Sequence, residues 1–232
     1  MTEGEWWSCD PTDLDRMLAF LHERRASTRK VGLFACACCR GIWSLFTDPR
    51  SQAAVEAAER YVDGLGSRDE LQAASHHARA AIEDSEQPRA LSVMAHRVTR
   101  CEAKEHWWSA AATAFAYLLD ASWRLERFHF TKRLTNGQRR EIFDVTARLR
   151  DLFGPLPFRT VSMDRAVLEW SDHTVQKIAQ AIYDEPDFTS LPVLADALEE
   201  AGCDNEELLS HCRGPGAHSR GWWCVDLILD QT

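Results

Sequence analysis

Five side chains of the types that bind zinc lie close together near the C-terminus of the chain. Cysteine thiolate and histidine imidazole are common ligands of tetrahedral zinc in proteins. The spacing contains no C-x-x-C knuckle, and cysteine is also among the residue types most often buried for packing alone. Two alternatives follow: a zinc site, or buried thiols beside hydrogen-bonded histidines. The five residues are Cys203, His211, Cys212, His218 and Cys224.

The same cluster contains the residue types of a thiol nucleophile, a base and an orienting acid, namely Cys212, His218 and Asp226. His211 precedes Cys212, but successive residues on a helix point about 100° apart, so His218 would have to act as the base. No signature of a known cysteine enzyme accompanies these residues. We therefore expect a non-catalytic protein, with a small metal protein or enzyme that uses Cys203 to Cys224 as the alternative.

A glycine-rich turn, R-G-P-G-A-H-S-R-G, occupies residues 213–221. Such a turn can bind a small anion, a phosphate or a carboxylate, through backbone N–H groups and positive charge. It lacks the lysine and the Ser/Thr ending of a Walker loop. Its candidate ligand-binding residues are Arg213, Gly214, Gly216, His218 and Arg220.

The other interpretation of this turn is structural. Its two arginines follow a pair of acidic helices, and exposed ion pairs need little geometric precision. We expect Arg213 and Arg220 to pair inside the chain with one or more of Glu199, Glu200, Glu206 and Glu207.

Helices that the apolar periodicity predicts carry or flank this cluster. Apolar residues recur at i, i+3, i+4 and i+7 after Asp172 and again after Ser190, which predicts two amphipathic helices. A D-x-x-E box from Asp204 to Glu207 predicts the start of a short third helix that carries Cys212. The apolar stretch Trp222–Leu229 closes the chain, and Trp222–Val225 and Thr160–Ser162 are its only plausible strand fragments.

The rest of the chain also follows helical spacing, and the prediction is an all-α, bundle-like body of about ten helices with a helical C-terminal module. The helix expected over residues 29–46 is apolar around most of its circumference, which is typical of a helix buried on several sides. The proline-containing segment 155–163 predicts an extended linker or arm between a body, 1–154, and a module, 164–232, unless the domain is continuous. The other helices are expected over residues 11–25, 51–65, 69–84, 89–102, 106–128 and 135–154.

The composition and charge of the chain argue against several classes of function. The formal charge of −9 argues against nucleic-acid partners, and the acidic opening and the lack of a long apolar run argue for a cytoplasmic protein without a membrane segment. The tryptophan pairs 6–7, 107–108 and 222–223 cannot each bury both rings on one helix face. We expect one ring of each pair near a surface or interface, unless it forms a second layer of the core. A basic segment, 124–150, alternates with acids such as Asp144 and Asp151 and is interpreted as a solvated face. We expect an interaction or regulatory protein that contacts a protein partner through an acidic, tryptophan-rimmed surface.

Two blocks carry a resemblance to an uncharacterised bacterial protein family. One is F-A-C-A-C-C-R-G-I-W near the N-terminus, and the other is L-A-D-A-L-E-E-A-G-C followed by H-C-R-G-P-G-A-H-S-R-G-W. The chain departs from the family pattern at Cys224, which follows the tryptophan pair, whereas members of the family place a cysteine just before the tryptophan. The resemblance implies a shared fold and no established activity.

Overall fold

The computed structural model describes residues 1–84, 89–100, 144–185, 188–214 and 218–231. Within these ranges the regular structure is entirely helical, with eleven α-helices and short 3-10 turns, so the all-α prediction is confirmed. The chain divides into two compact units, Met1–Arg148 and Leu149–Thr232, and the division falls within α9. The predicted linker 155–163 therefore lies inside the second unit, where Val161 belongs to the core.

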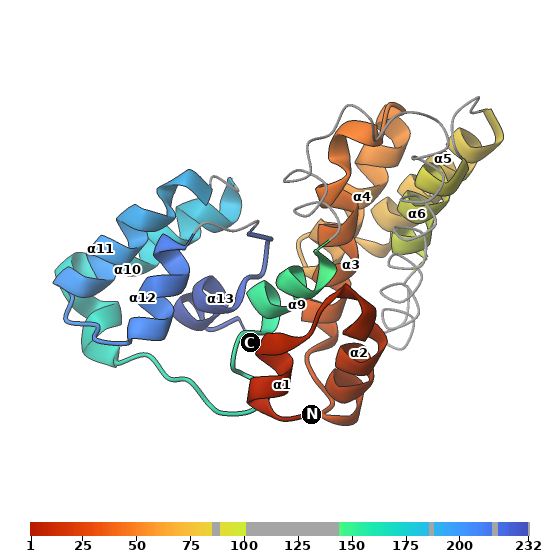
Figure 1. Cartoon of the computed structure of the whole chain (residues 1–232). Helices are drawn as coiled ribbons and strands as arrows, with labels where there is room; N and C mark the ends of the chain where they lie inside the picture. Colours follow the sequence, from red (N-terminus) through yellow and green to blue (C-terminus); the bar gives the residue numbers. More distant parts are fainter. Residues whose placement is uncertain (85–88, 101–143, 186–187, 215–217, 232) are drawn as a thin grey trace. The chain divides into compact units, whose positions relative to one another are not determined.

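The first unit contains α1 (Glu3–Ser8), α2 (Leu14–Glu23), α3 (Thr28–Gly41), α4 (Pro49–Val62), α5 (Arg68–Asp84) and α6 (Arg89–Thr99). Helices α4, α5 and α6 pack against one another, and α3 packs against α4 and α6 (Figure 1). Every residue from Lys30 to Cys39 is buried, as the apolar circumference of this helix predicts. The expected helix 106–128 lies outside the described residues.

Helix α3 ends earlier than the predicted residue 46. After Gly41 the chain passes into a 3-10 turn, Trp43–Leu45. The guanidinium of Arg40 lies 3.9 Å from the ring centroid of Trp43 and donates two hydrogen bonds, of 2.9 and 2.6 Å, to the buried Glu59 of α4. This contact fixes the end of α3 against α4.

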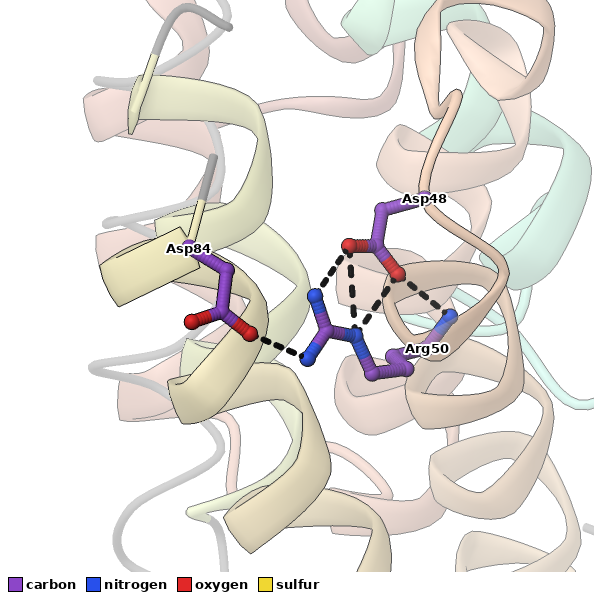
Figure 2. A network of polar contacts seen from close by, with 3 residues as sticks. All are labelled: Asp48, Arg50 and Asp84. Carbon is purple, nitrogen blue, oxygen red and sulfur yellow. Dashed lines mark hydrogen bonds and ion pairs between the residues drawn. The ribbon is translucent and has the colours of Figure 1, made fainter. Parts of the chain in front are cut away.

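A polar network joins the start of α4 to the end of α5 (Figure 2). Asp48 is the N-cap of α4 and accepts a hydrogen bond from the backbone N–H of Arg50, while Pro49 occupies the first turn. The guanidinium of Arg50 binds Asp48 and, at 2.7 Å, Asp84. The helix thus begins at Pro49 rather than at the predicted Ser51.

The second unit contains most of α9 (Val145–Phe153), together with α10 (Arg165–Asp184), α11 (Leu191–Glu200), α12 (Glu206–Arg213) and α13 (Trp223–Leu229). Helix α10 packs against α11 and α13, and α11 packs against α12. Their apolar stripes form one core, which includes the predicted positions Val175, Ala179, Ile182, Leu191, Leu194, Ala195 and Leu198.

Three local predictions for this unit are wrong. Residues 222–225 are not a strand: Trp222 is the N-cap residue of α13, without a side-chain cap, and it follows Gly221, whose φ is positive (+79°). Thr160–Ser162 forms no strand either, and follows the turns of residues 155–158. The N-cap of α12 is Asn205, whose side chain accepts the N–H of Leu208 at 3.1 Å, so the predicted box at Asp204 starts one residue too early.

Helix α10 contains a kink that the sequence pattern does not show. Trp170 is extended, and Ser171, Asp172 and His173 all adopt left-handed backbone angles, with φ of 47°, 57° and 60°. The regular helix that carries Val175, Ala179 and Ile182 begins after this kink, as the apolar periodicity after Asp172 predicts. Left-handed angles cost an L-residue about 1–2 kcal/mol, so the packing of α10 must offset several kcal/mol.

Candidate functional site

A buried carboxylate gathers the two histidines of the C-terminal cluster. Asp151 of α9 has a side chain that is 5% exposed, and its Oδ1 accepts hydrogen bonds from Nε2 of His211 at 3.2 Å and from Nδ1 of His218 at 2.8 Å. Its Oδ2 accepts the backbone N–H of Ser219 at 2.8 Å. Three donors therefore compensate for the desolvation of one carboxylate.

The residues that surround Asp151, and Asp151 itself, lie on three segments of the second unit. His211 lies in the last turn of α12, whose start is fixed by the Asn205 cap. His218 and Ser219 lie in the segment that leads into α13, which turns at Gly221. Asp151 lies in α9 between Leu149 and Leu152, which are both buried. The carboxylate thus connects residues that are 60 and 67 positions apart in the chain.

Aromatic rings enclose the two imidazoles. The ring centroid of Trp222 lies 4.8 Å from that of His218 and 5.8 Å from that of His211. Trp223 lies 5.7 Å from His211, and Phe188 lies 5.9 Å from His218. Both tryptophans are buried, so electrostatic interactions at the site are screened less than they would be in water.

The expectation for the tryptophan pairs is correct at one end of the chain and wrong at the other. Trp6 is buried while Trp7 is 41% exposed, as predicted. Trp222 and Trp223 are both buried, because Trp222 covers the histidines and Trp223 also packs beside Gly154. The pair 107–108 lies outside the described residues.

The cysteines of the predicted zinc set do not join the Asp–His–His group. Within the described residues, the metal-type ligand atoms that lie within 4.8 Å of one another belong to Asp151, His211 and His218. Cys212 and Cys224 are buried free thiols that hydrogen-bond to each other, and Cys203 is partly exposed in the loop before α12. The structure thus brings together the two predicted histidines and supplies Asp151 as the third candidate ligand.

Cys224 is a poor nucleophile because it is buried. Burial raises the pKa of the Cys224 thiol, and its hydrogen bond with Cys212 raises it further. The thiolate is the reactive form of cysteine, and buried thiols in apolar surroundings are inert. Cys212 is buried too and its thiol contacts Cys224, so the geometry gives no support to Cys212 as a catalytic residue.

The candidate anion-binding residues of the turn point to different partners. Arg213 binds Asp196 at 2.7 Å and also Glu199, whose pKa it lowers, so the expected internal pairing is confirmed for this arginine. Arg220 lies over the ring of Tyr183, 4.7 Å from its centroid. Gly214 ends α12, His218 faces Asp151, and Gly216 lies outside the described residues.

A small cleft lies next to the aromatic rings that pack against His218. Ser219, Arg220 and Trp222 line it together with Tyr183 and Phe188, and its cavity volume is about 10 Å³, which is room for one water molecule. Phe188 and Trp222 are also the rings that pack against His218. The cleft and the Asp–His–His group therefore have Phe188 and Trp222 as common neighbours.

Asp151 is the residue that the sequence interpretation missed. Its alternation with basic residues predicts a solvated face, yet Asp151 is buried. Arg148 and Thr146 on the same helix are buried as well, so α9 lacks the single apolar face that a periodic pattern detects. Only co-varying positions among related sequences would have linked Asp151 to histidines so far along the chain.

Comparison of the chain with protein-family models, with curated proteins and with solved structures found no match. Among the described helices, none combines the length and the apolar character that crossing a bilayer requires. The geometry around Asp151 is therefore the basis on which a function can be argued.

Proposed function

We propose that the second unit binds one divalent transition-metal ion through Oδ1 of Asp151, Nε2 of His211 and Nδ1 of His218. One observation carries the proposal: both imidazole nitrogens face the same carboxylate oxygen, at 3.2 and 2.8 Å, and the three atoms lie within 4.8 Å of one another. Ligands about 2.0–2.1 Å from a tetrahedral ion lie about 3.3 Å apart. Small side-chain movements would therefore admit the ion.

The chemistry of the donors suits such an ion. Two imidazoles and one carboxylate are ligands for zinc and for iron(II), and a neutral imidazole can move its proton to the other ring nitrogen when it binds a metal. The N–H of Ser219 holds Oδ2 of Asp151, which leaves Oδ1 directed at the histidines. Hydrogen bonds of this kind orient metal-binding carboxylates in known sites.

Calorimetric titration with zinc tests the proposal. The chain is first treated with a chelator and then titrated, and we expect one ion per chain. Asp151→Asn and His218→Gln should each weaken zinc binding by more than about 100-fold. His173→Gln is the matched control, because His173 is exposed in the kink of α10 and hydrogen-bonds to Gln176.

The hydrogen bonds around Asp151 also have a purely structural explanation, and the same titration separates the two. If Asp151 is only a hydrogen-bonded carboxylate without a metal role, zinc should show no saturable binding to the wild-type chain. It also predicts that Asp151→Asn lowers the melting temperature equally with and without zinc. Under our proposal, zinc raises the melting temperature of the wild-type chain and leaves that of Asp151→Asn unchanged.

A second proposal is the non-catalytic interaction role, in the cytoplasm, that the acidic composition predicts. It is favoured by the exposed acids of α11, of α12 and of the loop between them, which are Asp196, Glu199, Glu200, Asp204 and Glu206. Asp196 and Glu199 bind Arg213, and Val193 on α11 is 58% exposed. The fitting partner is a basic protein segment, whose binding should weaken steeply as salt increases. Titration of a lysine-rich peptide tests this: equal affinity for wild type and Glu200→Lys would contradict it.

A further inference from the structure

We infer that an ion held by Asp151, His211 and His218 keeps one coordination position for an exchangeable ligand, which is water or a small anion such as a carboxylate. This inference rests on the proposed metal site and goes further, because it distinguishes a reactive ion from a purely structural one. Structural zinc is almost always held by four protein ligands, whereas catalytic zinc has three protein ligands and an open position.

The first support is the number of protein donors. The described residues contribute three ligand atoms to the group, and Oδ2 of Asp151 is engaged by the N–H of Ser219. The nearby thiols of Cys212 and Cys224 hydrogen-bond to each other and lie outside the group. A fourth ligand therefore has to come from outside this set.

The second support is the uneven burial of the site. The side chains of Asp151 and His218 are 5% and 7% exposed, whereas that of His211 is 24% exposed. His211 is thus the most exposed of the three candidate ligands. A ligand that exchanges with solvent would enter on this side.

Charge and space define the class of ligand. A divalent ion with one carboxylate and two neutral imidazoles has a net charge of +1, and the buried rings around it reduce screening, so an anion is favoured over a neutral molecule. The cleft that shares Phe188 and Trp222 with the site has room for about one water molecule, so the space beside these rings is small. The smallest anions, such as azide, formate and acetate, are therefore the ones to test.

Cobalt(II) is a suitable probe because it replaces zinc in such sites and its visible spectrum reports the coordination. We expect the cobalt-loaded chain to change its visible spectrum on titration with sodium azide, to saturate at one azide per cobalt and to recover on dilution. Sodium perchlorate at equal ionic strength is the control and should have no effect. Acetate, titrated in parallel, should compete with azide.

The outcomes separate the two proposals. If cobalt binds and its spectrum does not respond to azide or acetate, the position is closed, and this inference is wrong while the metal site stands. If cobalt does not bind, both proposals fail. If the spectrum shows an intense near-ultraviolet thiolate band that Cys212→Ser or Cys224→Ser removes, a thiol is the fourth ligand and the exchangeable position is refuted.

Discussion

Replacing Gly154 by alanine should destabilise the second unit through the ring of Trp223. Gly154 follows α9 with a φ of +50°, and its N–H donates to the carbonyl of Arg150 at 2.7 Å. A Cβ at this position would lie 2.6 Å from Cγ and Cδ1 of Trp223. The ring is buried and already packs against His211, so it cannot move aside into solvent.

Two terms make up the expected loss in the free energy of unfolding. The left-handed backbone costs alanine about 1–2 kcal/mol, of which about 0.5–1 kcal/mol is offset because alanine loses less entropy on folding than glycine. Overpacking a buried site adds about 1–3 kcal/mol. The total loss in the free energy of unfolding should be about 1.5–4 kcal/mol.

Gly202→Ala is the matched control. Gly202 also has a positive φ, of +89°, but no atom lies within 4 Å of the Cβ that alanine would add. It should show only the backbone term, about 0.5–1 kcal/mol. Urea unfolding monitored by circular dichroism measures both variants. Equal losses for Gly154→Ala and Gly202→Ala would refute the packing of Trp223 described here.

Three further predictions concern stability. Ser171→Gly should stabilise the second unit by about 0.5–1 kcal/mol in urea unfolding, since glycine relieves the left-handed angle; a loss of stability would mean that the kink is not strained. Hydrogen bonding by the Thr2 N–H, followed by Arg16, lowers the pKa of Glu5 from 4.5 to about 2, so this carboxylate contributes stability above pH 4.5 that is lost as the pH falls towards 2. Glu5→Gln should therefore flatten the acid side of the stability profile, and an unchanged profile would count against this cap. Arg213→Gln removes two exposed ion pairs, with Asp196 and Glu199, and should leave the melting temperature nearly unchanged; a large decrease would show that α11 and α12 depend on them.

The helical fold could be predicted because the local signals agree with the tertiary packing. The stripe that contains Val175 and Ile182 is the face that α10 buries, and Pro49 and Gly202 lie at a helix start and a helix end. The segment from Trp222 to Val225 misled the strand prediction because bulky apolar residues in succession resemble a buried strand. A short helix that is buried on nearly all sides has the same composition.

The candidate site could be predicted only in part. His211 and His218 are close in sequence, which makes them natural candidates for one site. Asp151 comes from another helix, and its closeness to them is set by how α9 packs in the second unit. Cys212 and Cys224 have the side-chain chemistry of ligands, but they face each other in the core. Residue type indicated the chemistry, and tertiary packing selected which residues supply it.

Elemental analysis of the native chain, purified without a chelator, tests the central claim most directly. Wild type and Asp151→Asn are prepared in parallel from medium that contains zinc and iron, and their metal content is compared at equal protein concentration. Our account predicts about one equivalent of a divalent transition metal in the wild type and only a small fraction of that in Asp151→Asn. Equal metal content in the two proteins, or none in either while both are folded, would contradict it.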